Sequence, residues 1–251
     1  PLSTVGMRIE DRTRTFIIAM ERTVVPENFS FRMTDEEYRV LEKIKNSIPV
    51  CYLADHADFA LGIVTGNNKK FLSAEKTEHS EMVLKGTDIC KYHINPAKQY
   101  LRFEPEQFQQ VAPLEIYRAP EKLLYRFISN QLVVAYDDRQ MLSLNSCNIV
   151  IPKIEGMQIK YILAILNSSV SQFVYQKEFH SIKVLRAHME HIPIPRVGKA
   201  IQNEIIAMTE PLICGMGKEA AETCQKRLDC RIMDLFRLSA EEQWIIRHAL
   251  H

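Results

Sequence analysis

The stretch Leu61-Gly62-Ile63-Val64-Thr65-Gly66-Asn67-Asn68-Lys69-Lys70-Phe71 sets the pattern for the central part of this sequence. Its apolar half, Leu61 to Val64, is typical of a strand, and the glycine and two asparagines that follow are typical of a turn. Such a turn exposes backbone N–H groups beside two flexible cations, which suits a phosphate. A solvated hairpin turn has the same composition, so the residues alone leave both interpretations open.

Short strands and turns continue on the C-terminal side of this stretch, up to about residue 152. Residues 131–136 and 147–151 are rich in Val and Ile and are predicted to be strands. Between them, Asp137-Asp138-Arg139 is typical of a polar turn. Pro105 and Pro120 each stand where a short helix is expected to begin.

Helical patterns flank this central part on both sides. Thr34 and Glu37 form a capping-box pattern, which predicts a helix to about residue 47, before Pro49. Apolar residues then recur at helical spacing over 159–174, with a break or kink at 167–169. An extended crossing at 192–195 precedes three further helices, predicted at about 199–213, 218–236 and 240–249.

Together these patterns predict an α+β fold: a twisted, mostly antiparallel sheet or half-barrel with short helices, followed by a C-terminal helical subdomain. We expect a connector and docking helix over residues 1–53 and a central domain over 54–198. The helical subdomain would follow over 199–251.

Composition and charge narrow the class of protein. Of the 251 residues, 46% are hydrophobic and 25% charged, as in an ordinary folded domain. No apolar run approaches the ~18 residues of a membrane helix, and the N-terminus lacks a secretory pattern, so a cytoplasmic location is the default expectation. The six cysteines include no CxxC pair and predict no metal site. Residues 151–200 hold seven Lys/Arg and three Asp/Glu, an excess that suits a solvated face or a phosphate-facing one.

Motifs for catalysis are missing from the sequence. An adenine methyltransferase needs an Asn/Asp-Pro-Pro-aromatic loop for the flipped base and a glycine-rich loop for the methyl donor. Here Asn95-Pro96 continues with Ala97-Lys98, and no GxGxxG is present. No DxK or ExK pattern of a metal-dependent nuclease occurs either. We therefore expect no catalytic residue in this chain.

Six blocks, taken in order, resemble one family. They are Gly62 to Phe71, Leu84-Lys85-Gly86-Thr87-Asp88-Ile89 with Tyr92, Pro120-Glu121-Lys122-Leu123-Leu124 with Leu132 to Asp138, Leu144-Asn145-Ser146, Tyr161 to Ser168, and His191-Ile192-Pro193-Ile194-Pro195. These blocks are similar to motifs of the TaqI-like C-terminal specificity domain. That family supplies the target-recognition domains of adenine-N6 DNA methyltransferases and of type IIG restriction–modification enzymes. The tail from Leu228 to Glu242 resembles the usual last helices of these enzymes, so the resemblance covers about residues 55–250. It departs from the family at Tyr125-Arg126-Phe127, where members often carry a more polar stretch.

The resemblance implies a domain that recognises a specific sequence in double-stranded DNA. Its parent would be an adenine-specific methyltransferase, or a bifunctional restriction–modification enzyme whose catalytic domain is absent from this chain. That catalytic domain of the same polypeptide would be the protein partner, and it would bind S-adenosylmethionine, so no cofactor is expected here. No membrane partner is expected. The predicted DNA contacts are Thr65, Gly66, Asn67, Asn68, Lys69, Lys70, Lys85, Lys122 and Arg139.

Several interpretations stay open at this point. Asp137 and Asp138 would repel phosphates, so they are turn residues or acceptors for a cytosine amino group. The chain could also be a stand-alone type I-like specificity subunit, although such subunits normally carry two recognition units and one is visible here. A protein-interaction module without DNA binding is the third alternative, and a salt-dependent DNA-binding assay separates it from the others.

Overall fold

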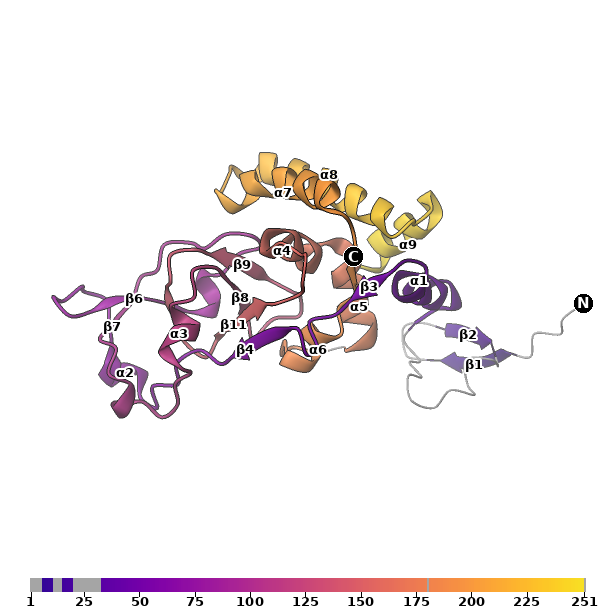
Figure 1. Cartoon of the computed structure of the whole chain (residues 1–251). Helices are drawn as coiled ribbons and strands as arrows, with labels where there is room; N and C mark the ends of the chain where they lie inside the picture. Colours follow the sequence, from indigo (N-terminus) through magenta and orange to yellow (C-terminus); the bar gives the residue numbers. More distant parts are fainter. Residues whose placement is uncertain (1–5, 11–14, 20–32, 180, 251) are drawn as a thin grey trace, which may run out of the picture.

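A computed structural model describes residues 6–10, 15–19, 33–179 and 181–250 (Figure 1). The fold is α+β, as predicted, and its sheets are open. The main sheet has four antiparallel strands in the order β4-β11-β8-β9. These are β4 (Ala57–Ala60), β8 (Lys122–Arg126), β9 (Val134–Asp137) and β11 (Cys147–Pro152).

A second four-stranded sheet, in the order β10-β6-β7-β5, lies at one end of the molecule (left in Figure 1). Only its β10–β6 pair is parallel. Its strands are β5 (Leu72–Ser73), β6 (Glu81–Leu84), β7 (Tyr100–Leu101) and β10 (Leu142–Ser143). Around it lie the short helices α2 (Asn68–Phe71), η3 (Gly86–Asp88), η4 (Pro105–Gln107) and α3 (Leu114–Tyr117).

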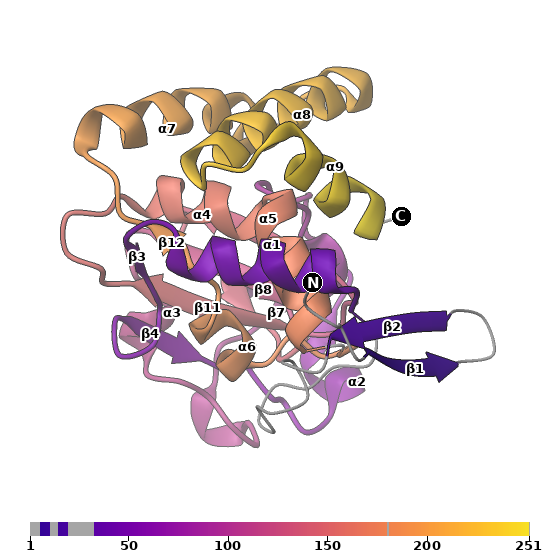
Figure 2. The ribbon, with the colours of Figure 1, turned by 90° about the vertical axis from the view of Figure 1, so that its right-hand side faces the viewer.

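Helices cover the main sheet and form the opposite end of the molecule. In Figure 2 a layer with α4 and α5 separates the sheet from α7 and α8, and α1 and α9 lie beside it. The larger of two hydrophobic cores contains residues from all seven helices and from the main sheet, and the second core contains residues from both four-stranded sheets. The helices are α1 (Asp35–Asn46), α4 (Ile159–Asn167), α5 (Ser169–Glu178), α6 (Arg186–Glu190), α7 (Lys199–Ile213), α8 (Lys218–Leu235) and α9 (Ala240–Ala249).

Local capping signals account for several helix boundaries. The Thr34 hydroxyl accepts a hydrogen bond from the Glu37 N–H at 3.1 Å, and the Glu37 carboxylate accepts one from the Thr34 N–H at 3.0 Å. Ser239 and Glu242 form the same capping box at the start of α9. Ser168 ends α4 and caps α5, since its hydroxyl accepts from the Ser171 N–H at 3.2 Å. The predicted break at 167–169 is therefore confirmed.

Other expectations about the elements were wrong. Residues 120–126 do not begin a helix, because β8 pairs with both β11 and β9 and that pairing overrides the local proline signal. Residues 61–64 form two isolated bridges, Ile63 to Leu144 and Val64 to Gln110, and the regular strand β4 lies just before them.

The predicted connector also contains unexpected structure. The antiparallel strands β1 (Gly6–Glu10) and β2 (Thr15–Ala19) fall within it, and β3 (Val50–Cys51) pairs with β12 (Ile194–Pro195) in the extended crossing. The rest of residues 1–32 lies outside the described residues. Within the described part of the chain, no helix combines the length and the apolarity needed to cross a membrane.

Candidate functional site

Two glycines bring three of the family-like blocks together at the edge of the second sheet. A Cβ on Gly62 would lie 2.2 Å from the Leu144 carbonyl oxygen, and one on Gly86 would lie 2.5 Å from that of Ser146. Only residues without a Cβ allow such an approach of backbone to backbone. The segments around Gly62, Gly86 and 144–146 can therefore pack directly against one another.

Hydrogen bonds fix these three segments in register. The Ile63 N–H donates to the Ser143 carbonyl at 2.7 Å, and the Asn145 N–H donates back to the Ile63 carbonyl at 3.1 Å. The Leu144 N–H donates to the Leu84 carbonyl at 2.8 Å. The Ser146 hydroxyl accepts from the Gly86 N–H at 3.0 Å. The sequence blocks that are separate along the chain thus form one continuous surface.

The turn after Gly62 forms a short helix and not a hairpin. Gly66 has φ +76°, a conformation that other residues adopt at a cost. Asn67 then caps α2 by accepting from the Lys70 N–H at 3.2 Å, and the Thr65 hydroxyl donates to the Asn68 side-chain oxygen at 2.6 Å. Gly66 to Lys70 are exposed, whereas Thr65 is buried.

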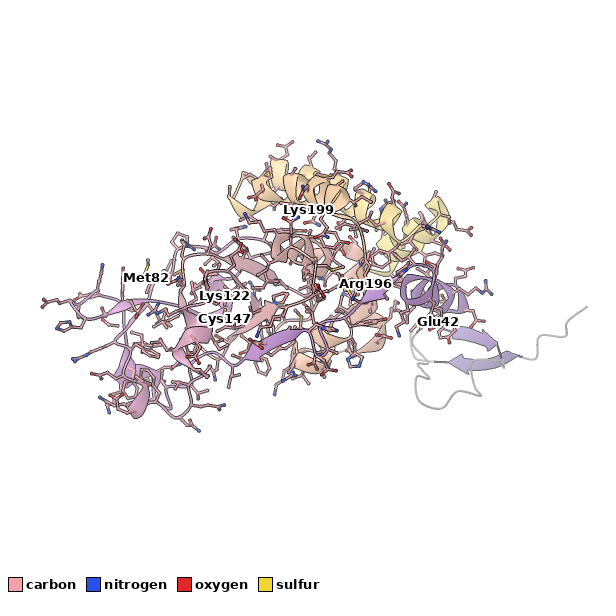
Figure 3. The ribbon with its side chains drawn as sticks, viewed as in Figure 1. Glu42, Met82, Lys122, Cys147, Arg196 and Lys199 are labelled. Atoms are coloured by element: carbon pink, nitrogen blue, oxygen red, sulfur yellow. The ribbon has the colours of Figure 1, made fainter. Side chains whose placement is uncertain are left out.

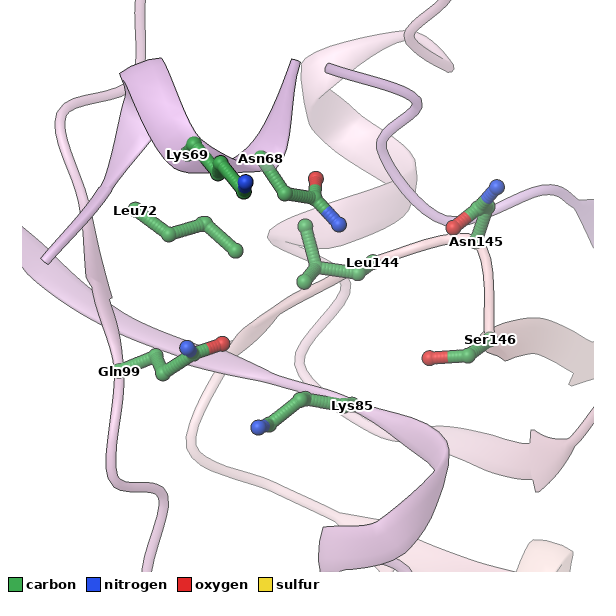
Figure 4. Close-up of a pocket in the computed structure, with 8 residues that line it drawn as sticks. All are labelled: Asn68, Lys69, Leu72, Lys85, Gln99, Leu144, Asn145 and Ser146. Carbon is green, nitrogen blue, oxygen red and sulfur yellow. The ribbon is translucent and has the colours of Figure 1, made fainter. Parts of the chain in front are cut away.

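A polar hollow of about 440 Å³ lies where these segments meet (Figure 4). Its lining comes from α2, β5, the residue after β6, the residue before β7 and the β10–β11 turn. We call it the polar hollow, and its lining residues are Asn68, Lys69, Leu72, Lys85, Gln99, Leu144, Asn145 and Ser146.

The polar hollow is positively charged, because its lining holds two lysines and no carboxylate. Neither Lys69 nor Lys85 forms an ion pair with another described residue. Lys70 stands next to it, with its ammonium 4.6 Å from the centre of the Phe71 ring. By contrast, two other hollows carry acids: Glu222 lines one at α7–α8, and Glu121 and Glu210 line one beside α4. The polar hollow is the one of these three that suits an anion.

The structure gathers part of the predicted DNA-contact set at this place. Asn68, Lys69 and Lys85 line the polar hollow, and Gly66, Asn67 and Lys70 belong to the adjacent turn. Thr65 supports that turn from a buried position. Arg139 is exposed in the turn between β9 and β10, outside the lining, and its N–H donates to Asp137 at 2.9 Å.

The structure contradicts the prediction that Lys122 contacts DNA, because the Lys122 side chain is 0% exposed. Figure 3 labels it within the body of the molecule. Its ammonium lies 2.6 Å from the Asp137 carboxylate and donates to the Tyr117 carbonyl at 2.6 Å. Burial lowers the pKa of Lys122, and Asp137 opposes part of that shift. A lysine held this way cannot reach a phosphate.

Asp137, the partner of Lys122, is the last residue of β9, and its side chain holds the turn that follows, in line with the turn interpretation. Its carboxylate accepts from the N–H groups of Arg139 and Met141, each at 2.9 Å.

Sequence reasoning missed Gln99, Asn145 and Ser146 as members of the site. Asn145 and Ser146 belong to one of the six blocks that resemble the family, and their polar side chains could have marked them as candidate contacts. Gln99 lies in none of these blocks.

Among the described residues, no group of three His, Cys, Asp or Glu side chains could hold a metal ion. The described cysteines form no disulfide: Cys51 and Cys147 are buried, and Cys214 and Cys230 are exposed. The lining of the polar hollow itself offers two lysine ammonium groups, three side-chain amides and the Ser146 hydroxyl.

Solved structures to which this chain is similar include several from restriction–modification systems. The structure of the type IIL enzyme MmeI in complex with DNA has a TM-score of 0.50 at 11% identity, over 76% of this chain and 34% of that one. A chain from a type I restriction–modification system has a TM-score of 0.44 at 13% sequence identity, over 86% of this chain and 51% of that one. The HsdS subunit from Thermoanaerobacter tengcongensis has a TM-score of 0.41 at 13% sequence identity, over 86% of this chain and 50% of that one. This chain thus spans a third to a half of their length.

No curated protein matches the sequence. The model of one family does: the TaqI-like C-terminal specificity domain matches residues 81–194, which include Lys85, Gln99 and the 144–146 turn of the polar hollow. Asn68 and Lys69 lie on the N-terminal side of that match. Residues 81–194 of this chain therefore match the TaqI-like C-terminal specificity domain.

Proposed function

We propose that this chain recognises a specific sequence in double-stranded DNA, with the polar hollow and the adjoining α2 turn as its contact surface. The observation that carries the proposal is the positive charge of Lys69 and Lys85, which form no ion pair with a described residue, in a hollow whose lining has no carboxylate. Cations of this kind bind phosphates and set the register of a protein on the duplex. Side-chain amides beside them are the groups that read base edges.

The proposal includes a division of labour with a catalytic methyltransferase domain. That domain would bind S-adenosylmethionine and flip the adenine, while this chain grips the duplex and selects the site. The absence of methyl-donor and base-binding motifs in the sequence supports this arrangement. The fold shared with MmeI, which was solved in complex with DNA, supports a role on the same kind of ligand.

Salt dependence of binding tests the proposal. Fluorescence anisotropy would follow the affinity of the chain for a labelled duplex pool across a series of salt concentrations. Each phosphate contact contributes about −0.9 to the slope of log K against log [salt]. Replacing Lys69, Lys70 and Lys85 with alanine should flatten that slope by about one to three units.

A matched control uses three lysines of the C-terminal helices. Lys199, Lys218 and Lys226 are exposed on α7 and α8, and their replacement with alanine removes the same total charge. The control triple variant should keep the wild-type slope. Equal flattening by both triple variants would refute the polar hollow as the contact surface. A chain without measurable affinity for duplex DNA at low salt would refute the function itself and leave the protein-interaction alternative.

A further inference from the structure

The side-chain amide of Gln99 has no hydrogen bond to any residue that the structure describes. Its backbone is fixed, since the Val83 N–H donates to the Gln99 carbonyl at 3.0 Å, directly before β7. Its side chain lines the polar hollow (Figure 4). The Oε1 atom is buried and has no hydrogen-bond partner in the described part of the chain. The amide forms no side-chain hydrogen bond with any described residue.

Three other buried amides show what a structural amide does in this fold. Gln172 bonds both the N–H and the carbonyl of Leu132 at 2.9 Å. Asn167 does the same with Val134, at 3.1 and 2.8 Å. Gln202 accepts from the Gln158 N–H and donates to the Gly156 carbonyl, each at 2.9 Å. The Gln99 side chain has no such partner among the described residues, so it does not brace the backbone as these three amides do.

The surroundings of Gln99 favour a base edge over a phosphate for this amide. Lys69 and Lys85 already supply cations to the polar hollow. The exposed Asn145 side chain has no hydrogen bond to a described residue, and Asn68 uses its oxygen for Thr65 and keeps its NH₂ group unpartnered. A side-chain amide presents an N–H donor and a carbonyl acceptor side by side. In the major groove the donor matches N7 of adenine and the acceptor matches its N6–H.

We propose that Gln99 is a specificity-determining residue that reads an adenine in the major groove. Its side chain would turn from its present rotamer so that Oε1 accepts from adenine N6–H and Nε2 donates to N7. The new contact satisfies the oxygen that is unpartnered in the free protein. This inference rests on the proposed DNA recognition and adds the chemical identity of one base in the site.

Selection from a duplex pool with a randomised centre tests it, with sequencing of the bound fraction. The wild-type chain should enrich a motif that contains adenine at one position. Gln99→Leu should lose about 5- to 100-fold discrimination at that position alone, the usual worth of a bidentate base contact. Because no internal hydrogen bond is lost, its thermal unfolding should match the wild type. Gln99→Glu should shift the preference toward cytosine, whose amino group donates to a carboxylate.

A control variant separates the added charge of Gln99→Glu from its position. Gln131→Glu places the same charge at an exposed glutamine outside the lining, and it should keep the wild-type motif. An unchanged motif in Gln99→Leu, or a lost preference for a base other than adenine, overturns the inference and leaves the proposed function intact. A wild-type chain that enriches no motif overturns the sequence-specific function and the inference with it.

Discussion

The buried pair of Lys122 and Asp137 makes a sharp prediction about stability. In Lys122→Met the ammonium disappears from a site where both side chains are 0% exposed and 2.6 Å apart. The Asp137 carboxylate then keeps only two backbone N–H donors, and the Tyr117 carbonyl loses its bond of 2.6 Å. Breaking one side of a buried pair costs about 3–5 kcal/mol. For a chain of this size that lowers Tm by roughly 6–20 °C.

Thermal and urea unfolding measure this loss, and a double variant tests its cause. Lys122→Met with Asp137→Asn removes both charges while an amide oxygen can still accept a backbone N–H. Neutral replacements of buried pairs recover much of the loss, so the double variant should be more stable than Lys122→Met. A Lys122→Met chain that unfolds within about 1 kcal/mol of the wild type, but binds DNA with a flatter salt slope, would refute the structural role and restore the DNA contact.

Further predictions concern Gly62, Gly66, His188 and the methyl donor. Gly62→Ala should unfold or strongly destabilise the chain because its Cβ would meet a carbonyl at 2.2 Å, whereas Gly66→Ala has its nearest non-neighbouring atom at 3.4 Å and strains only a positive φ. Gly66→Ala should therefore weaken DNA binding more than stability, and equal affinity in anisotropy would remove this turn from the site. Burial lowers the pKa of His188 below its usual 6.5. A hydrogen bond with the Lys183 backbone raises the pKa and the charge of His191 lowers it, and the net effect is a lowered pKa. The unfolded chain then takes up this proton first as pH falls, so the contribution of His188 to stability is present above pH ~6.5 and is lost below it. Urea midpoints at pH 8 and 5 should show this drop, reduced in His188→Asn, and an equal drop in that variant would exclude His188 as the cause. Isothermal titration with S-adenosylmethionine should give no heat of binding, and micromolar affinity would contradict the division of labour.

Helices were predictable from the sequence because their signals are local. The capping boxes at Thr34 and Ser239 and the breaks near residues 168 and 215 lie within one turn of the boundaries that they set. The strand β8 was not predictable in this way. It is defined by partners at 134–137 and 147–150, and Pro120 before it carries an equally good helix signal.

The site was predictable only in part, for a related reason. Lysine is usually exposed, and nothing near Lys122 in the sequence marks it as buried. Only the register of β8 on β9 sets it opposite Asp137, fifteen positions later. Gln99 reaches the polar hollow through the pairing of β6 with β7, which no motif announces. By contrast, Gly62, Gly86 and the 144–146 turn were visible as blocks, and the structure explains why they belong together.

Hydrogen exchange of the chain with and without duplex DNA tests the central claim most directly. We predict that DNA slows exchange of backbone amides at 66–72, 85–86, 99 and 144–146, the segments that form the polar hollow and its adjoining turn. Amides of α8 and α9, at the other side of the molecule, should be unchanged (Figure 1). Protection confined to α7–α9, with none around the polar hollow, would contradict the account.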